Sequence, residues 1–300
     1  MFTILSCDGG GVFGALTAAL IEKMDKSCPQ FLASVDLFTG TSTGSFIALG
    51  LAAGYTPTEI VTFYQQYGPK VFPKNLFRTV LSGDGALFSR YPNTGLKAAL
   101  KTLFGDKKMS DLKRKVLIPT FQLDGRQKGD VRSWTTVFFD ETSNDLIVDV
   151  ALRSSAAPCL FPSHQGFIDG GVTCNNPAVA AVSEAFAKGK QLSDIKLLSI
   201  GTGKGKDYIP GDVSWGALGW GIDVLKILLL AGMEVQDHHC RMLLGKSYFR
   251  LNPVVGNQIG MDDVGEIPAL IKLGRATDTT AVGRFCWAGL SPVPLKAEPQ

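Results

Sequence analysis

Short apolar segments alternate with longer helical patterns along most of the chain. The strand candidates are residues 2–7, 34–39, 115–121, 133–139 and 195–201, and the helical runs are 13–26, 44–54, 57–67, 94–104, 177–188 and 221–244. This alternation predicts an α/β protein with three α/β/α layers, in which helices cover both faces of a mostly parallel central sheet. Ligands of such folds bind at the carboxyl ends of the strands, so residues that follow strands are the first functional candidates.

A serine stands at the turn between the second strand candidate and the helix that follows it. Ser42 is the centre of the sequence Gly40-Thr41-Ser42-Thr43-Gly44. Gly40 and Gly44 lack the Cβ atoms that would otherwise hold the strand and the helix apart. A side chain at such a sharp turn is exposed to an incoming substrate. Ser42 is therefore the candidate nucleophile.

Two further glycine-rich segments favour a catalytic role for this serine. The first strand candidate runs into Gly9-Gly10-Gly11-Val12-Phe13-Gly14 at the start of a helix. Uncovered N–H groups at a helix N-terminus bind negative charge, either a phosphate or the oxyanion of an acyl intermediate. The second segment is Asp169-Gly170-Gly171, whose glycines let another stretch of backbone approach one carboxylate. Asp169 is the candidate base.

Two segments also match nucleotide-binding patterns. Gly9-x-Gly11-x-x-Gly14 fits the dinucleotide fingerprint, and Asp36 follows Gly14 by 22 residues, near the place of a ribose-binding acid. We disfavour this interpretation because Asp36 lies inside an apolar run and the serine turn occupies the next loop. The stretch from Gly201 to Lys206 resembles a phosphate loop, but it is one residue short and Asp207 replaces the hydroxyl residue. A tight loop after a strand is the favoured interpretation.

Taken together, the three glycine motifs resemble those of the patatin-like phospholipases, lipid acyl hydrolases that use a serine–aspartate dyad. The segment from Gly9 to Gly14 is similar to the oxyanion loop of that family, Gly40 to Gly44 to its nucleophile elbow, and Asp169 to Gly171 to its Asp-Gly-Gly/Ala element. Other segments that resemble the family are Ser154-Ser155-Ala156-Ala157-Pro158, Asn175-Asn176-Pro177-Ala178 and Leu198-Ser199-Ile200-Gly201-Thr202-Gly203. The resemblance covers roughly residues 3 to 252, and we expect a bacterial member.

The resemblance implies a mechanism of acyl transfer. Ser42 would attack a fatty-acyl ester of a phospholipid, Asp169 would accept its proton, and an acyl-enzyme would then be hydrolysed. The N–H groups of Gly10, Gly11 and Thr43 would hold the oxyanion. The supporting residues are Gly9, Gly14, Gly40, Gly44, Gly170 and Gly171. We expect no metal and no cofactor.

Alternatives to this mechanism remain open. A Ser–Asp–His triad is met in chain order by Ser42, Asp169 and either His238 or His239, but both histidines lie in a helical pattern rather than in a loop. The chain could also be a regulatory, storage or scaffold protein with vestigial esterase activity, or a nucleotide-switched antiphage phospholipase. The sequence leaves open the lipid head group, the acyl position, the preference among phospholipids, galactolipids and other lipids, and the oligomeric state.

Length and cysteine content bound the organisation. We expect one domain over residues 1–290 and a loose tail over 291–300, which carries three prolines between Ser291 and Gln300. The six cysteines show no metal-ligand spacing, which indicates reduced thiols. The glycine loop begins within about ten residues of Met1, too early for a secretion signal, so the expected location is the cytoplasm.

A basic segment over about residues 68–115 suggests a contact with an anionic membrane surface. Between Lys70 and Lys115 the net charge is +8, whereas the whole chain carries only +3. Trp215, Trp220 and the Leu-rich helix after them are a second candidate for peripheral membrane contact, with a buried helix lining an acyl groove as the alternative. Nucleic acid is not an expected partner.

Overall fold

The computed structural model describes residues 1–73, 88–126, 132–205, 208–209, 211–256 and 259–287. The predicted tail, residues 291–300, lies outside these ranges, as does the middle of the predicted basic segment, residues 74–87. In the part of the chain that the structure describes, no helix combines the length and the apolar character that crossing a bilayer requires.

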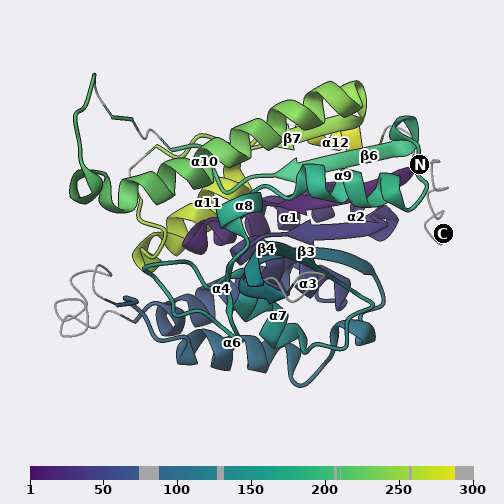
Figure 1. The fold of residues 1–300 in the computed structure, drawn as a ribbon. Coiled ribbons are helices and arrows are strands. Elements are labelled where there is room, and N and C mark those ends of the chain that lie inside the picture. The colour runs from purple at the N-terminus through teal and green to yellow at the C-terminus, as the bar shows by residue number, and fades with distance from the viewer. Residues whose placement is uncertain (74–87, 127–131, 206–207, 210, 257–258, 288–300) are drawn as a thin grey trace, which may run out of the picture.

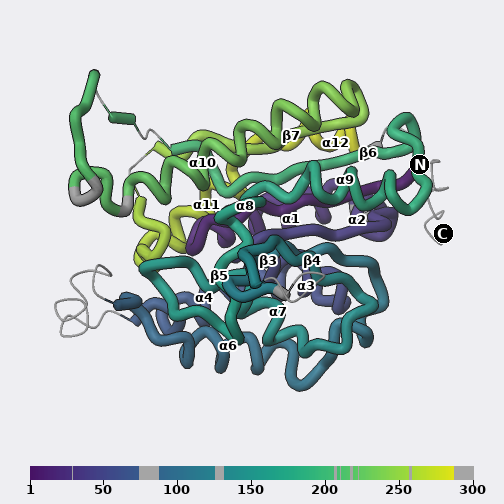
Figure 2. The backbone as a smooth tube through the Cα atoms, viewed as in Figure 1, coloured from purple at the N-terminus to yellow at the C-terminus, as the bar shows by residue number. Residues whose placement is uncertain are grey.

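A seven-stranded sheet forms the centre of the fold (Figures 1 and 2). Its strands are β1 (Phe2–Cys7), β2 (Leu37–Gly40), β3 (Lys115–Arg126), β4 (Arg132–Asp140), β5 (Phe167–Asp169), β6 (Ile195–Ile200) and β7 (Tyr248–Leu251). The strands follow the order β4-β3-β2-β1-β6-β7, and β5 pairs with β3 off this path. All pairings from β3 through β2, β1 and β6 to β7 are parallel, whereas β4 and β5 run antiparallel to β3. The predicted mostly parallel sheet is confirmed.

Strand β3 changes its partner along its length. Its first residues pair with β2 up to Leu117, which stands opposite Thr39, and from Thr120 onward it pairs with β5, where Asp169 stands opposite Thr120. Pro119 lies between the two pairings and has no N–H to contribute to a ladder. Strand β3 therefore pairs first with β2 and, after Leu117, with β5, and we call this change of partner the fork in β3. The carboxyl ends of β2 and β5 point toward each other there.

Helices cover both faces of the sheet. They are α1 (Gly14–Ser27), α2 (Pro29–Ser34), α3 (Thr43–Ala52), α4 (Pro57–Val71), α6 (Thr94–Phe104), α7 (Ile147–Ser154), α8 (Gly171–Cys174), α9 (Ala178–Ala187), α10 (Ala217–Leu244), α11 (Ile267–Ala276) and α12 (Thr280–Trp287). Successive residues of β1 point to opposite faces, so Leu5 joins a core with α1, α3, α4, α6, α7 and α11, and Ile4 joins a second core with α9 and α10. In Figure 1 the strands follow one another from β7 and β6 in the upper part to β3 and β4 lower down, with α10 along the top and α4, α6 and α7 at the bottom. The three-layer prediction is confirmed.

The predicted and observed elements differ mainly at short segments and at boundaries. All five strand candidates contain strands, but the short strands β5 and β7 were not predicted. The helices that were not predicted are α2, α7, α8, α11 and α12. Helix α10 begins at Ala217 and contains a non-helical Gly221, where the sequence pattern predicted the helix to begin. Glycine at that position lets the helix axis change direction without ending the helix.

Candidate active site

Ser42 lies at the apex of a strained turn. It follows β2, precedes the first residue of α3 and has a φ of 52° with a ψ of −122°. Non-glycine residues rarely adopt such a conformation, and it persists only where the surroundings impose it. A Cβ on Gly40 would lie 2.1 Å from the Gly44 carbonyl oxygen, so strand and helix pack as closely as the sequence predicted. The turn is a nucleophile elbow in its geometry.

Buried hydroxyl groups hold this turn. The Ser42 N–H donates to Ser154 Oγ over 3.1 Å, and Ser154 Oγ in turn donates to the Pro119 carbonyl over 2.8 Å. The Ser45 hydroxyl donates to the Ser42 carbonyl over 2.6 Å. Ser154 is fully buried, and its own carbonyl accepts from Gly170 N–H over 3.2 Å. Ser154 therefore ties the turn of Ser42 to the fork in β3 and to the segment that carries Asp169.

Asp169 lines the same cavity as Ser42, and the Ser42 hydroxyl is close enough to act on the pKa of its carboxyl group. Asp169 ends β5, is 5% exposed, and its Oδ1 accepts from Gly171 N–H over 2.7 Å. Burial raises the pKa of this carboxyl group to about 6, although the Ser42 hydroxyl and the hydrogen bond from Gly171 oppose that rise. A carboxylate with a pKa near neutrality is a better proton acceptor than an exposed aspartate and is still ionised at pH 7 or above.

The glycine loop lies beside Ser42. A Cβ on Gly9 would be 3.2 Å from the Ser42 Cβ, and the Gly9 N–H donates to the Asn175 carbonyl over 3.0 Å. Among the residues that the structure describes, none accepts a hydrogen bond from the N–H of Gly10 or Gly11. Both glycines line the same cavity as Ser42 and Thr43. The three predicted oxyanion-hole residues thus lie around the candidate nucleophile.

The remaining predicted glycines also permit close contacts around the site. A Cβ on Gly14 would lie 2.2 Å from Thr43 Oγ1, and one on Gly170 would lie 2.2 Å from the Pro119 carbonyl oxygen. For Gly171 the nearest atoms are Asn175 Oδ1 at 2.8 Å and Asp169 Oδ1 at 3.0 Å. Any side chain at these positions would displace the backbone or side chain next to it.

An apolar cavity of about 250 Å³ opens at Ser42 and Asp169. Its walls come from α4, α10 and the segments around residues 155–161 and 259–267, and its apolar lining residues include Phe46, Phe63, Val71, Phe72, Leu96, Phe161, Leu225, Leu229 and Ile267. Besides Asp169, the charged residues of the described lining are Lys226 and the ion pair of Arg90 with Asp262. Such a lining suits an apolar ligand.

A buried ion pair that sequence reasoning missed anchors the glycine loop. Arg250 of β7 reaches across β6 and donates through both terminal nitrogens to the carboxylate of Asp8, which is fully buried. Arg250 Nη1 also contacts Ser199 Oγ at 2.7 Å. The two residues of this ion pair are 242 positions apart, and no sequence pattern connects them.

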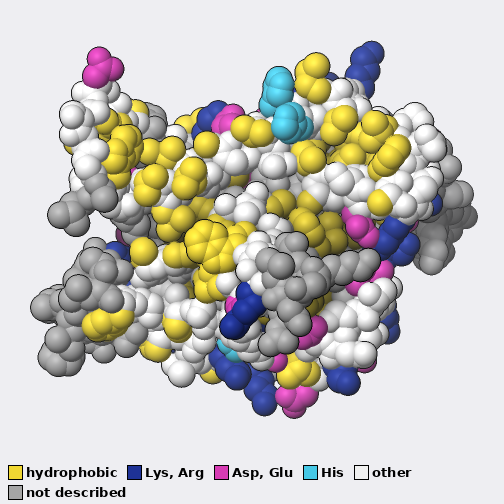
Figure 3. All heavy atoms as spheres, viewed as in Figure 1, with side chains coloured by type: hydrophobic (Ala, Val, Ile, Leu, Met, Phe, Trp, Pro, Cys, Tyr) yellow, Lys and Arg dark blue, Asp and Glu magenta, His cyan; other side chains and the backbone are white. Residues whose placement is uncertain are grey.

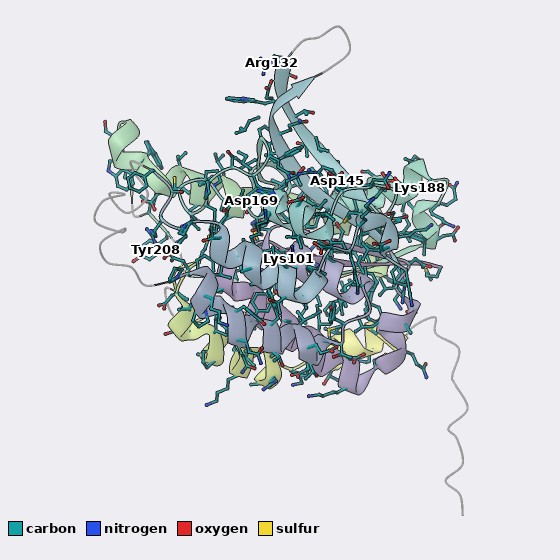
Figure 4. The ribbon with its side chains drawn as sticks, turned by 90° about the horizontal axis from the view of Figure 1, so that it is seen from below. Lys101, Arg132, Asp145, Asp169, Lys188 and Tyr208 are labelled. Atoms are coloured by element: carbon teal, nitrogen blue, oxygen red, sulfur yellow. The ribbon has the colours of Figure 1, made fainter. Side chains whose placement is uncertain are left out.

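The histidines lie away from this site. His238 and His239 are exposed on α10 and are absent from the cavity lining (Figure 3, cyan), while His164 Nε2 pairs with Asp149 at 2.8 Å. The buried Asp169 is labelled in Figure 4. The Gly201 to Gly205 stretch is a loop after β6, and Thr202 Oγ1 donates to the Gly9 carbonyl over 3.0 Å, so this loop supports the glycine loop.

Comparisons with known proteins find related chains in bacteria. Protein teg of Priestia megaterium is 29% identical, with 95% of this chain and 97% of that protein covered. The putative sporulation hydrolase CotR of Bacillus subtilis is 30% identical over the same shares, 95% and 97%. The cGAMP-activated phospholipase of Vibrio cholerae is 29% identical, with 87% and 81% covered.

A solved structure and a family model extend the comparison. VipD from Legionella pneumophila aligns with a TM-score of 0.43 at 11% identity, covering 90% of this chain and 66% of that one. The model of the patatin-like phospholipases matches residues 5–182, which include the glycine loop, Ser42 and Asp169. Because that match spans more than half of the chain, this protein belongs to the patatin-like phospholipase family.

Proposed function

We propose that the protein hydrolyses fatty-acyl esters of phospholipids through a Ser42–Asp169 dyad and an acyl-enzyme intermediate. The observation that carries the proposal is that Ser42, on a strained turn, and the buried Asp169 line one apolar cavity. Relatives named as phospholipases and as a putative hydrolase support the same reaction class.

In the first half of the proposed reaction, Ser42 Oγ bonds to the carbonyl carbon of the ester and its proton passes to Asp169. The oxyanion that forms accepts hydrogen bonds from the N–H groups of Gly10, Gly11 and Thr43, and each such donor contributes about 3 kcal/mol in comparable sites. The bond to the leaving alcohol then breaks, and the alcohol takes the proton from Asp169. The apolar cavity would hold the acyl chain meanwhile.

In the second half, water enters and gives a proton to Asp169 as its oxygen attacks the acyl-enzyme carbonyl. The fatty acid leaves, and Ser42 recovers its proton from Asp169. Each proton transfer in this cycle involves the carboxylate of Asp169 and no imidazole. That assignment follows from the position of the three histidines, all outside the described cavity lining.

Release of fatty acids from a mixed phospholipid extract tests the proposed function. The purified protein is expected to release free fatty acids and lysophospholipids, which mass spectrometry identifies together with the head group preferred. Ser42→Ala removes only the attacking oxygen and is expected to release none above background, and a fluorophosphonate probe should label the wild type but not this variant. Equal release by both proteins would refute the role of Ser42.

The pH profile gives an independent test of the base. Because burial raises the pKa of Asp169 to about 6, the fraction in the proton-accepting form rises with pH through that value. We expect kcat/KM for an uncharged short-chain ester to rise about tenfold per pH unit below pH 6 and to level off above about pH 7. A profile already level at pH 5 would show that a different group limits the reaction.

A further inference from the structure

Exposed apolar side chains concentrate on one helix. In its first half, α10 exposes Val224 by 44%, Ile227 by 40% and Leu228 by 61%, and Trp215 just before the helix is 41% exposed. Figure 3 shows apolar side chains gathered over this helix. Large exposed apolar surfaces of this kind mark contact sites for other molecules.

The opposite side of the same helical turns is apolar too. Leu225 and Leu229 line the cavity that holds Ser42, and Leu229 Cδ2 lies 3.1 Å from the position of a Cβ on Gly171. A helix at an ordinary protein surface is polar on the side away from the core. The same turns of α10 therefore carry apolar side chains on both sides, one facing the surroundings and the other forming part of the cavity wall.

The charge and aromatic content of this segment fit a lipid surface. Between Trp215 and Gly232 the charged residues are Asp223 and Lys226, so the segment has no net charge. The rings of Trp215 and Trp220 pack edge to face at 5.4 Å. Tryptophan next to a leucine-rich helix is typical of segments that lie in the boundary between head groups and acyl chains.

The predicted basic segment has one basic residue, Arg90, in the described cavity lining, whereas its Lys101 lies away from α10. Lys101 of α6 is on the underside of the fold, where Figure 4 labels it, whereas α10 is on top in Figure 1. Lys101 pairs with Asp106 at 3.3 Å. Attraction between Lys101 and anionic lipid would not bring the cavity of Ser42 to the bilayer. A contact through α10, whose Leu225 and Leu229 line the cavity, would instead bring the cavity to the bilayer.

We propose that the first half of α10 docks on a phospholipid bilayer through Trp215, Val224, Ile227 and Leu228, and so places the cavity wall formed by Leu225 and Leu229 against the acyl chains. This inference rests on the proposed function, because it takes the substrate to be a membrane lipid. Docking lets an acyl chain pass from the bilayer into an apolar cavity without crossing water.

The test compares two double variants of the same helix. Val224→Ser/Leu228→Ser changes the proposed docking side, and Met242→Ser/Leu243→Ser changes residues that are 73% and 45% exposed in the far half of α10. None of the four side chains lines the cavity of Ser42. Each double variant is made in the Ser42→Ala background for sedimentation with phosphatidylcholine vesicles, so that no lipid is consumed.

We expect the docking variant to bind these vesicles at least tenfold more weakly and the control to stay within twofold of its parent. Binding of the parent should change little between 50 and 500 mM NaCl, because the contact is apolar. With Ser42 intact, the docking variant should lose activity on vesicles but keep its activity on a monomeric short-chain ester, which also shows that it is folded.

Two results would overturn the docking inference. One is unchanged vesicle binding in the docking variant. The other is a wild-type dimer, seen by light scattering, that dissociates in the docking variant while vesicle binding persists, which would assign the surface to a second copy of the chain. Absence of ester hydrolysis by the wild type on both vesicles and the monomeric ester would instead refute the proposed function.

Discussion

Asp169→Asn is expected to lower kcat/KM on a short-chain p-nitrophenyl ester by at least a thousandfold, about 4 kcal/mol in the barrier. The amide retains an oxygen for the Gly171 N–H, which donates to Asp169 over 2.7 Å, but it accepts no proton from Ser42. His238→Ala and His239→Ala should each stay within tenfold of the wild type, since both histidines are exposed and outside the cavity. Loss of activity in either histidine variant to the Asp169→Asn level would mean that a triad operates.

The thermal stability of the same variant is an internal control. The pKa of Asp169 in the folded protein, about 6, lies above its ordinary value, so the protonated form favours folding. The stability that protonation contributes is full below about pH 4 and is lost as the pH rises through about 6. At pH 8 the wild type therefore carries an unfavourable buried charge that asparagine removes. We expect Asp169→Asn to melt at the same or a higher temperature at pH 8, although it is inactive.

Arg250→Met is expected to reduce the free energy of unfolding by about 3–5 kcal/mol, because it leaves the fully buried Asp8 carboxylate without its partner. The glycine loop directly follows Asp8, so the oxyanion site should be lost with the stability. Urea denaturation measures the effect. Arg241→Met is the matched control, because that arginine pairs with Asp237 on the same protein but is 56% exposed.

The control is expected to change stability little, since exposed ion pairs contribute little. The double variant Asp8→Asn/Arg250→Met should recover part of the loss, because it removes the buried charge together with its partner. A single Arg250→Met variant as stable as Arg241→Met would show that Asp8 is protonated and needs no cation.

The fold and the candidate site were predictable to different degrees. The strands of residues 2–7 and 195–201 were evident because both of their faces are buried and their sequences are mainly apolar. Ser42 and Asp169 were found from their glycine neighbours, since a Cβ at Gly40, Gly44 or Gly170 would approach within 2.3 Å of another backbone oxygen. A need for glycine at a close backbone approach is visible in the local sequence, because only glycine lacks a Cβ.

Local sequence could not predict the contacts between residues far apart in the chain that hold the site in place. Ser154 lies in a segment that resembles the family, yet only the structure shows its contact with the N–H of Ser42, 112 residues earlier. The partner of Asp8 is still more distant, and β5 is too short for any periodicity. The basic segment remains a prediction, because residues 74–87 lie outside the described part of the chain.

Because of the fork in β3, the distance between Ser42 and Asp169 depends on one strand, with which both β2 and β5 pair. Leu117 pairs with Thr39, which lies three residues before Ser42, and Thr120 pairs with Asp169. Strand β3 therefore positions both side chains. The loops that lead into β2 and β5 can therefore vary in length without moving the two side chains apart. If a residue were inserted or deleted between Leu117 and Thr120, most of the sheet would still form, but Ser42 and Asp169 would move apart. The length of this short stretch of β3 therefore sets the distance between nucleophile and base.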